Sequence, residues 1–363
     1  MKILYAINSD GLGHAVRSIP IIKELKKNNH EIHIITSKNV KDFLGDSFGD
    51  CTLIPQFAFN YNDNEIDYWN TFIDTFYISK GNIQNFKKII KLIKDYHPDI
   101  LISDLERFSL WCAQIMEIPT ICVDNHSTIF RGKVDFEFKD TSNFITTKSI
   151  SKILAPHADR YFGLCFYKTK IIKKNTMFFD PILLDEQYDY KPKKKNYILI
   201  YNRFFNKDII SEIKKIKNEK FILFGSNRNH VSKNIEFIKM GTPGMYKYIA
   251  NAKAFITNGG HTSISEAIYY KTPIYSMPIK KQFEQITNAH YLEKMGFGEK
   301  HITIDKNKLE AFCNKLDYYT ENLKKHKYKS KNKFLKEFKK AIKELVEKKE
   351  KKKCLKIKKI FKK

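Results

Sequence analysis

The sequence has few of the residues that mark disulfide-linked, metal-binding or membrane-spanning proteins. Its 363 residues include only 6 cysteines and 2 tryptophans. The cysteines form no Cys-x-x-Cys pair and lie near no histidine cluster, which argues against a zinc site or a disulfide framework and favours a reducing compartment. No window of about 18 uncharged apolar residues occurs, so we expect no segment to span a bilayer. The apolar run from Ile3 to Ile7 is too short for a secretory signal.

Basic residues outnumber acidic ones, with 66 Lys+Arg against 40 Asp+Glu, and the excess is unevenly placed. The formal net charge is +26, and the stretch from Leu323 to Lys363 contributes 20 lysines and 4 glutamates. Most of the excess charge therefore lies in this terminal stretch, and the charge of the rest of the chain is nearly ordinary. Its 42% apolar content, with 28 Phe and 20 Tyr, excludes a natively disordered chain.

Short β-branched and aromatic runs alternate with longer amphipathic stretches, which predicts an α/β protein with parallel sheets. We expect strands at Ile3–Asn8, Ile32–Ser37, Ile100–Asp104, Thr120–Asp124, Tyr197–Tyr201, Phe221–Phe224, Ile235–Lys239, Ala254–Thr257 and Ile274–Met277. The pattern restarts after a polar, proline-containing stretch, so it predicts two doubly wound, Rossmann-like domains that face a cleft. The expected divisions are 1–180, a linker at 181–195, 196–325, and a basic helix and tail at 326–363.

In such sheets ligands lie beyond the carboxyl ends of the strands, so the loops there are the places to look for a site. The first loop has Gly11, Gly13 and His14, followed by Arg17 on the expected helix. Two glycines allow a tight turn and a close backbone approach to a ligand. The alternative is a plain strand-to-helix turn with a solvated histidine. The third glycine and the acidic residue of the dinucleotide fingerprint are missing, so we expect no nicotinamide or other cofactor.

The second loop follows the strand that ends at Thr257 and combines a glycine pair with hydroxyl residues. Backbone N–H groups, side-chain hydroxyls and a helix N-terminus together make a cradle for diphosphate. A glutamate one turn further along could accept hydrogen bonds from a ribose diol. The alternative for that glutamate is a helix capping box. The residues concerned are Asn258, Gly259, Gly260, His261, Thr262, Ser263 and Glu266.

A third segment places an acid and an amide, Glu284 and Gln285, where a loop meets the next helix. Adjacent carboxylate and amide groups suit the vicinal hydroxyls of a sugar, because each hydroxyl both donates and accepts. The segment begins at Pro278 and continues into Asn288 and Ala289.

Taken together, residues 257–298 resemble the donor-site signature of inverting glycosyltransferases of the GT-B fold. The likeness is greatest to the bacterial cell-wall lipid-intermediate N-acetylglucosaminyltransferase family and its uncharacterised archaeal and bacterial relatives. The shared positions are Gly259, Gly260, Ser263, Glu266, Pro278, Glu284, Gln285, Asn288 and Ala289, together with Gly11, Gly13, His14 and Arg17 in the first loop. The resemblance implies a nucleotide-diphosphate sugar, with uridine expected as the nucleoside, held mainly by the C-terminal domain. It implies a glycan or lipid-linked acceptor on the N-terminal domain.

The same resemblance implies roles for individual residues. Glu266 would bind the ribose, Thr262 and Ser263 the diphosphate, and Glu284 with Gln285 the sugar. Many relatives have a basic residue ahead of the glycine pair where this chain has Asn258, so His261 or a residue from the other domain would have to supply the positive charge. The pair Glu284-Gln285 replaces the commoner Asp-Gln, which leaves the sugar open.

Inverting transfer needs a base for the acceptor hydroxyl and stabilisation of the leaving diphosphate. His14 is the expected base, since imidazole titrates near neutral pH. Asp104 and Asp124 end neighbouring strands, and either could orient His14 or act alone; the alternatives are a helix N-cap for Asp104 and simple strand termination for Asp124. No Asp-x-Asp motif is present, so we expect transfer without a metal ion.

The lysine-rich tail allows two interpretations. Phe334, Phe338 and Ile342 recur at helical spacing, which predicts a last helix packed on the core. The basic residues beyond it would either attach to an anionic membrane surface or form a solvated terminus. We therefore expect a cytoplasmic protein that can associate peripherally with the membrane. Two other functions stay open, a nucleotide-sugar 2-epimerase and a polyanion binder, although no recognised module for specific nucleic acids is present.

Overall fold

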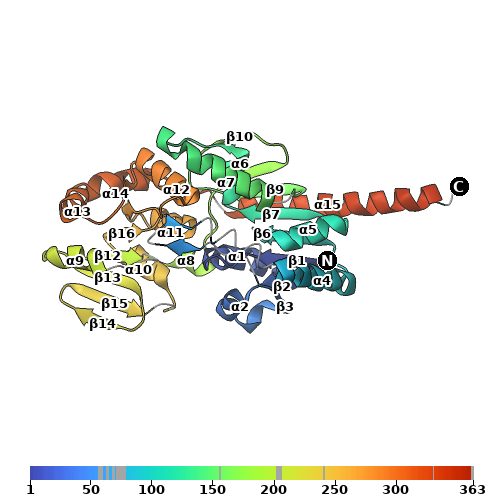
Figure 1. The fold of residues 1–363 in the computed structure, drawn as a ribbon, viewed down its shortest axis with the longest axis horizontal. Helices are drawn as coiled ribbons and strands as arrows, with labels where there is room; N and C mark the ends of the chain where they lie inside the picture. Colours follow the sequence, from blue (N-terminus) through green and yellow to red (C-terminus); the bar gives the residue numbers. More distant parts are fainter. Residues whose placement is uncertain are drawn as a thin grey trace.

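The computed structural model of the chain describes residues 1–55, 60–62, 65–67, 70, 79–154, 157–201, 207–239, 242–329 and 331–360. Within these residues the chain forms two α/β domains, each built around a seven-stranded sheet (Figure 1). The predicted fold class, two doubly wound Rossmann-like domains, is confirmed.

All strand pairs of the N-terminal sheet are parallel, in the order β11-β9-β7-β6-β1-β2-β3. Its strands are β1 (Lys2–Ile7), β2 (Glu31–Thr36), β3 (Cys51–Leu53), β6 (Ile100–Asp104), β7 (Thr120–Asp124), β9 (Arg160–Leu164) and β11 (Thr176–Phe179). The central strands are buried on both faces, as their continuous apolar runs indicate. Two short antiparallel pairs lie outside the sheet: β4 (Tyr61–Asn62) with β5 (Glu65–Ile66), and β8 (Gly132–Lys133) with β10 (Lys170–Ile171).

Helices cover both faces of this sheet. The helices of this part of the chain are α1 (Gly13–Lys27), α2 (Lys38–Leu44), α4 (Ser79–Tyr96), α5 (Arg107–Ile115), α6 (His126–Arg131) and α7 (Thr141–Leu154), with 3-10 turns at Asp46–Phe48 and Phe138–Asp140. Alternating side chains of β1 point to opposite cores. Tyr5 packs with α1 and α2, whereas Leu4 packs with α4 and α5. The carboxyl ends of β1, β6 and β7 are thereby left open toward the second domain.

The C-terminal sheet has the order β14-β15-β13-β12-β16-β17-β18, parallel except for the edge strand β14. Its strands are β12 (Ile198–Tyr201), β13 (Phe221–Ser226), β14 (His230–Ser232), β15 (Ile235–Lys239), β16 (Ala254–Thr257), β17 (Ile274–Ser276) and β18 (Gly298–Lys300). The helices are α8 (Asp185–Asp189), α9 (Lys207–Lys215), α10 (Met245–Asn251), α11 (His261–Tyr269), α12 (Phe283–Lys294), α13 (Lys306–Cys313), α14 (Leu316–Lys325) and α15 (Lys331–Ile360).

The predicted strands all occur, and β6, β7, β15 and β16 have the predicted ends. The short strands β3, β9, β11, β14 and β18 were not predicted. The polar stretch expected to be a linker contains α8. The side chain of Gln187 in this helix is fully buried, which the polar composition did not indicate.

The last helix, α15, returns to the N-terminal domain. Phe334 and Phe338 pack edge-on against Phe162 of β9, with ring centroids 5.7 and 5.3 Å away. Ala341, Ile342 and Leu345 complete this contact. The apolar spacing thus produces a helix packed on the core, as predicted. Beyond these residues the helix extends away from the body of the protein (Figure 1).

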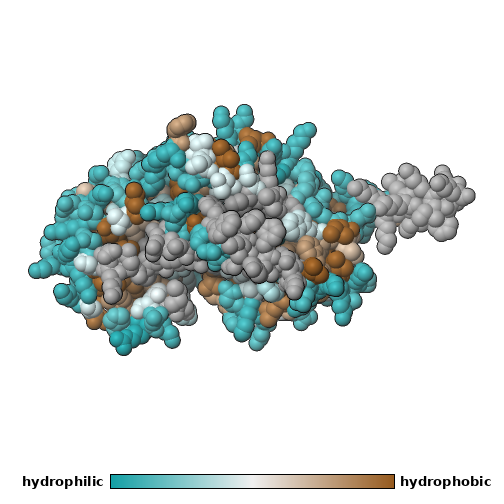
Figure 2. Space-filling model, viewed as in Figure 1, coloured by the Kyte–Doolittle hydropathy of each residue, from teal (hydrophilic) through white to brown (hydrophobic). Residues whose placement is uncertain are grey.

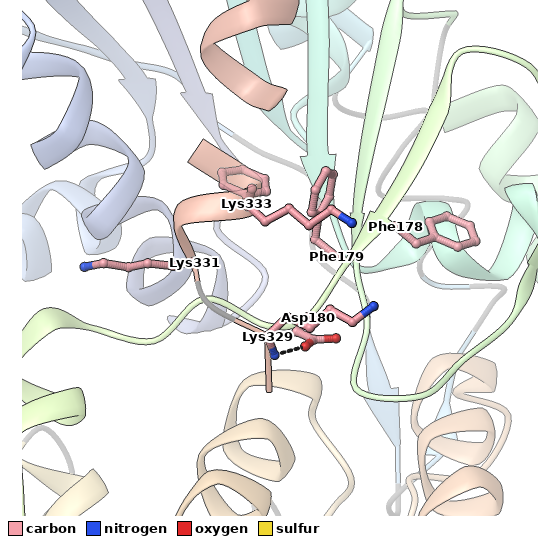
Figure 3. Close-up of a pocket in the computed structure, with 7 residues that line it drawn as sticks. Phe178, Phe179, Asp180, Lys329, Lys331 and Lys333 are labelled. Carbon is pink, nitrogen blue, oxygen red and sulfur yellow. Dashed lines mark hydrogen bonds between the residues drawn. The ribbon is translucent and has the colours of Figure 1, made fainter. Parts of the chain in front are cut away.

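The chain crosses between the domains after β11 and again before α15, and the two crossings lie side by side. The backbone N–H of Lys329 donates to the carboxylate of Asp180 (Figure 3). A hollow between the crossings is lined by Phe178, Phe179, Asp180, Lys329, Lys331, Lys333 and Phe334. None of these lining residues belongs to the loops that carry the sequence motifs.

On the face shown in Figure 2, hydrophilic residues cover most of the coloured surface, with smaller apolar patches between them. Among the described residues, no helix is both long and apolar enough to cross a membrane.

Candidate active site between the domains

The loop after β1 brings the start of α1 against the second domain. Gly11 has φ +91°, a left-handed conformation that favours glycine. At Gly13 a Cβ atom would lie 2.9 Å from Oγ1 of Thr262 on α11, which is too close for another side chain. The hydroxyl of Thr262 donates to the Gly13 carbonyl at 3.3 Å. The two glycines therefore let the first loop of one domain touch the helix start of the other.

His14, Asp104 and Arg17 form a buried cluster at the carboxyl ends of β1 and β6. Nδ1 of His14 lies 2.8 Å from Oδ1 of Asp104, and the guanidinium of Arg17 holds both carboxylate oxygens at 2.5 Å. Burial raises the pKa of Asp104, but Arg17 and His14 outweigh burial and leave its pKa below the usual value. Asp104 is thus an ionised acceptor. It is positioned to orient His14. The alternative role as a helix N-cap is wrong, because Glu106 caps α5.

The contact with a carboxylate sets the tautomer of His14. Because an ionised Asp104 can only accept, Nδ1 carries the proton and Nε2 is left as a proton acceptor. Nη2 of Arg17 also lies 2.6 Å from Nδ1, and that contact by itself would require the opposite tautomer. Asp104 decides the tautomer. Arg17 already donates to both carboxylate oxygens of Asp104, and it keeps these hydrogen bonds when Nδ1 of His14 also donates to Asp104.

Asp124, the other aspartate considered for orienting His14, caps the first turn of α6 instead. Its two oxygens accept from the backbone N–H and the hydroxyl of Ser127, at 2.5 and 3.0 Å. Burial raises the pKa of Asp124. These contacts correspond to the strand-terminating, structural alternative.

The two residues after Asp124 cross the cleft. The side chain of Asn125 donates to Oε1 of Glu284 at 2.6 Å and accepts from Arg17 at 2.7 Å. Nε2 of His126 lies 2.6 Å from Oε2 of Glu284. Burial lowers the pKa of His126 and raises that of Glu284, but their mutual attraction wins in both cases, so the pKa of His126 is raised and that of Glu284 is lowered. They form an ion pair between the domains.

The glycine pair after β16 forms a tightly packed loop. Gly259 has φ +91°, and a Cβ there would lie 3.0 Å from the hydroxyl of Ser276. Asn258 donates to the carbonyl of Met277 at 3.1 Å, and Asn288 donates to the carbonyl of Gly259 at 3.0 Å. Asn258 and Asn288 therefore hold this loop against the neighbouring strand and helix. The loop delivers the N-terminus of α11 to the cleft.

The first turn of α11 is His261, Thr262 and Ser263. The hydroxyl of Ser263 donates to the carbonyl of Gly260 at 3.1 Å. The imidazole of His261 is 6% exposed, and its Nε2 has no hydrogen-bond partner among the described residues. Burial, helped by the nearby Arg17, lowers the pKa of His261 to about 3. With this lowered pKa His261 is neutral near pH 7, and the nearby guanidinium of Arg17 is already paired with Asp104.

Glu266 lies one turn further along α11 and is 5% exposed. Its Oε1 accepts from the side chain of Gln187 at 2.7 Å, and burial raises its pKa to about 7. Gln285, by contrast, uses its carboxamide oxygen to accept from the backbone N–H of Ile279 at 2.9 Å. The carboxylate of Glu284 faces the N-terminal domain, whereas that of Glu266 faces α8.

Sequence reasoning did not select Asn125, His126 or Gln187 as site residues. Asn125 and His126 directly follow a buried strand that ends in Asp124, so a polar run at a strand end was the available signal. Gln187 gave no such signal. Within the described part of the chain, no group of three or more His, Cys, Asp or Glu residues is arranged to hold a metal ion.

Known proteins are similar to this chain in sequence. An uncharacterised glycosyltransferase of Methanosarcina acetivorans is 24% identical over 326 residues, which cover 82% of this chain and 85% of the relative. The UDP-N-acetylglucosamine–N-acetylmuramyl-(pentapeptide) pyrophosphoryl-undecaprenol N-acetylglucosamine transferase of Thermosipho africanus is 30% identical over 151 residues, covering 38% of this chain and 45% of that enzyme.

Among solved structures, UGT2 of Phytolacca americana, in complex with UDP-2-fluoro-glucose and pterostilbene, superposes with a TM-score of 0.64. It is 12% identical, and the match covers 89% of this chain and 92% of that one. The likeness confirms the GT-B arrangement of the two domains. The model of the family described as glycosyl transferase family 1 matches residues 1–317. This chain belongs to glycosyl transferase family 1 and is a glycosyltransferase.

Proposed function

We propose that the protein transfers a sugar from a uridine diphosphate sugar to a hydroxyl acceptor, with inversion at the anomeric carbon and without a metal ion. The observation that carries the proposal is the His14–Asp104 pair, 2.8 Å apart, next to the contact between Gly13 and Thr262. A base oriented by a carboxylate thus lies beside the start of α11. UDP or a UDP-sugar appears in the names of the solved neighbour from Phytolacca and of the Thermosipho enzyme.

In this mechanism, Nε2 of His14 takes the proton of the acceptor hydroxyl as its oxygen bonds to the anomeric carbon. The bond from that carbon to the diphosphate oxygen breaks at the same time, and its electrons leave with the nucleotide. Asp104 stabilises the imidazolium that forms, and Arg17 keeps Asp104 ionised.

The diphosphate would lie at the start of α11. Helix geometry leaves the N–H groups of His261, Thr262 and Ser263 without intrahelical partners, and the helix dipole adds favourable potential for an anion. These groups would stabilise the leaving charge. Glu266 would accept from the ribose hydroxyls, while Glu284 and Gln285 would read the sugar.

The sugar-reading role requires Glu284 to exchange partners. In this structure its oxygens accept from Asn125 and His126, so sugar hydroxyls would have to replace or share those contacts. The acceptor, which the sequence predicts to be a glycan or a lipid-linked sugar, would enter from the N-terminal side, past Gly11 and His14.

Incubation with a series of UDP-sugars and hydroxyl acceptors tests the proposal. We expect acceptor-dependent release of UDP, a product of inverted anomeric configuration by NMR, and unchanged rates in EDTA. Retention of configuration or loss of activity in EDTA would contradict the mechanism. Conversion of the UDP-sugar to another sugar without any acceptor would show an epimerase instead.

We also propose that the lysine-rich end of α15 attaches to an anionic membrane surface. The helix extends beyond the core contacts of Phe338 and Leu345, and each lysine near such a surface contributes about 1 kcal/mol. The fraction of protein that sediments with phosphatidylserine vesicles should decrease when salt is added and when residues 350–363 are deleted. Binding that is unaffected by salt, or loss of sugar transfer on deletion, would contradict this role. Salt-sensitive binding to RNA but not to vesicles would show a polyanion binder.

A further inference from the structure

A glutamine from the stretch between the two domains is in direct contact with the glutamate of the donor motif. Gln187 of α8 is fully buried, and its Nε2 lies 2.7 Å from Oε1 of Glu266 on α11. The two residues are 79 positions apart in the sequence. Neither the polar composition around Gln187 nor the glycosyltransferase motif predicts the contact.

The orientation of the Gln187 amide is fixed by the backbone of its own helix start. The N–H of Leu184 donates to Oε1 of Gln187 at 2.7 Å. Because a backbone N–H can only donate, the oxygen of the amide must face Leu184 and its NH2 group must face Glu266. Gln187 can therefore act toward Glu266 only as a donor.

The helix that carries Gln187 is itself anchored on α11. The hydroxyl of Tyr270 donates to the carbonyl of Gln187 at 2.9 Å, and the ring of Tyr188 packs edge-on against Tyr269 with centroids 5.5 Å apart. Backbone, side chain and ring contacts thus place the Gln187 amide in one position, which limits where the Glu266 carboxylate can lie.

The other oxygen of that carboxylate is unused. Oε2 of Glu266 is buried and has no hydrogen-bond partner among the residues that the structure describes. A buried, unpartnered carboxylate oxygen is costly, and a ligand hydroxyl that donates to it would remove that cost. Burial raises the pKa of Glu266, and the hydrogen bond from Gln187 opposes that rise.

We infer that Gln187 is a positioning residue for nucleotide binding: by holding Oε1 of Glu266, it aims Oε2 at the ribose diol of the donor. The inference rests on the proposed function, in which Glu266 binds the ribose. Gln187 touches no substrate itself and acts only through Glu266. Its location in the segment that joins the domains makes this segment part of the donor site.

The test varies both the ligand and the side chain at position 187. Binding of UDP and of 2′,3′-dideoxy-UDP is measured by calorimetry for the wild type, Gln187→Leu and Gln187→Met. The matched control is Glu186→Gln, an exposed residue on the same helix. Gln187→Met keeps an unbranched side chain of similar length, so it serves if Gln187→Leu folds poorly.

For the wild type we expect UDP to bind about tenfold or more tightly than its dideoxy form, because hydrogen bonds to a carboxylate are lost in the latter. Gln187→Leu and Gln187→Met should weaken UDP about tenfold and leave the Kd of dideoxy-UDP unchanged, so that the preference disappears. The Glu186→Gln control should keep the preference.

Equal weakening of both ligands would show that Gln187 is merely structural and would overturn the inference while leaving the proposed function standing. Retention of the full preference for UDP in both variants would overturn it too. A wild type that binds UDP but does not distinguish it from the dideoxy form would contradict the role of Glu266, and a wild type that binds no UDP would contradict the proposed donor as well.

Discussion

Asn125, at the end of β7, donates to Glu284 on α12 at 2.6 Å and accepts from Arg17 at 2.7 Å. Through this one amide, the cluster that holds the expected base is connected to the residue expected to read the sugar. The groups proposed to activate the acceptor and to recognise the donor are thus joined by a continuous chain of hydrogen bonds across the cleft.

Replacement of the proposed base should slow transfer without loss of donor binding. We expect His14→Gln to lower kcat by about 10² to 10⁴-fold, because general base catalysis contributes that much, while the Kd for UDP stays the same. Steady-state kinetics with a matched His157→Gln control, an exposed histidine, checks the effect. A His14→Gln enzyme of undiminished kcat would mean that another group takes the proton.

The ion pair between His126 and Glu284 should make stability depend on pH. The raised pKa of His126 means that the pair stabilises the fold fully below the ordinary value of 6.5, and that this stabilisation is lost as the pH rises through the raised value. The lowered pKa of Glu284 means that the stabilisation by the pair is present above pH 4.5 and is lost as the pH falls through the lowered pKa.

We therefore expect Glu284→Gln and His126→Gln to reduce the free energy of unfolding most between pH 4.5 and 6.5. The expected reduction there is about 3 kcal/mol, because a buried pair loses one partner, and it should be smaller at higher pH. Urea unfolding across pH 4.5 to 9 measures the difference. Glu310→Gln, at an exposed site, is the control. A pH-independent difference would be inconsistent with an ion pair.

His261 should make the protein sensitive to acid. Its pKa is about 3 in the folded protein, largely through burial, against an ordinary value of 6.5, so the unfolded chain binds a proton that the folded chain excludes. Stability should fall as the pH drops below 6.5, by about 2 kcal/mol at pH 5. The free energy of unfolding of His261→Asn should not show this fall at low pH. The control variant His230→Gln, at an exposed residue, should still show it. Identical acid profiles for wild type and His261→Asn would refute the prediction.

Ionisation of the buried Glu266 should lower the free energy of unfolding at alkaline pH. Its pKa of about 7, raised by burial from 4.5, means that the folded state holds a proton longer than the unfolded state, so stability declines as the pH rises from 4.5 through 7. Glu266→Gln should therefore be more stable than the wild type at pH 8, by up to about 3 kcal/mol, and show little difference at pH 4.5.

At pH 8, where Glu266 of the wild type is ionised, the same Glu266→Gln variant should gain less thermal stabilisation from UDP, because the ribose hydroxyls lose a charged acceptor. Melting temperatures at both pH values, with and without UDP, test the two effects together. A variant that is less stable than the wild type at pH 8 would contradict the burial argument, and one that keeps the full effect of UDP would contradict the ribose contact.

The sequence by itself determined the two α/β domains and the loops that carry the site. Strands such as Ile100–Asp104 can be recognised because a strand covered on both faces is mostly apolar, and Gly259 can be recognised because its left-handed backbone conformation favours glycine. The helical spacing of Phe334 and Phe338 likewise indicated a packed helix, although not the domain on which it packs.

Only the tertiary structure decided which polar groups meet. Asp104 rather than Asp124 contacts His14 because β6 is the neighbour of β1 in the N-terminal sheet. Glu284 faces His126 because of the way the two domains are placed against each other, and Gln187 holds Glu266 because α8 packs on α11. These contacts join residues 79 to 158 positions apart, and a local pattern carries no information about them. Burial, which makes His261 neutral and keeps a proton on Glu266 up to about pH 7, is likewise a property of the assembled cleft.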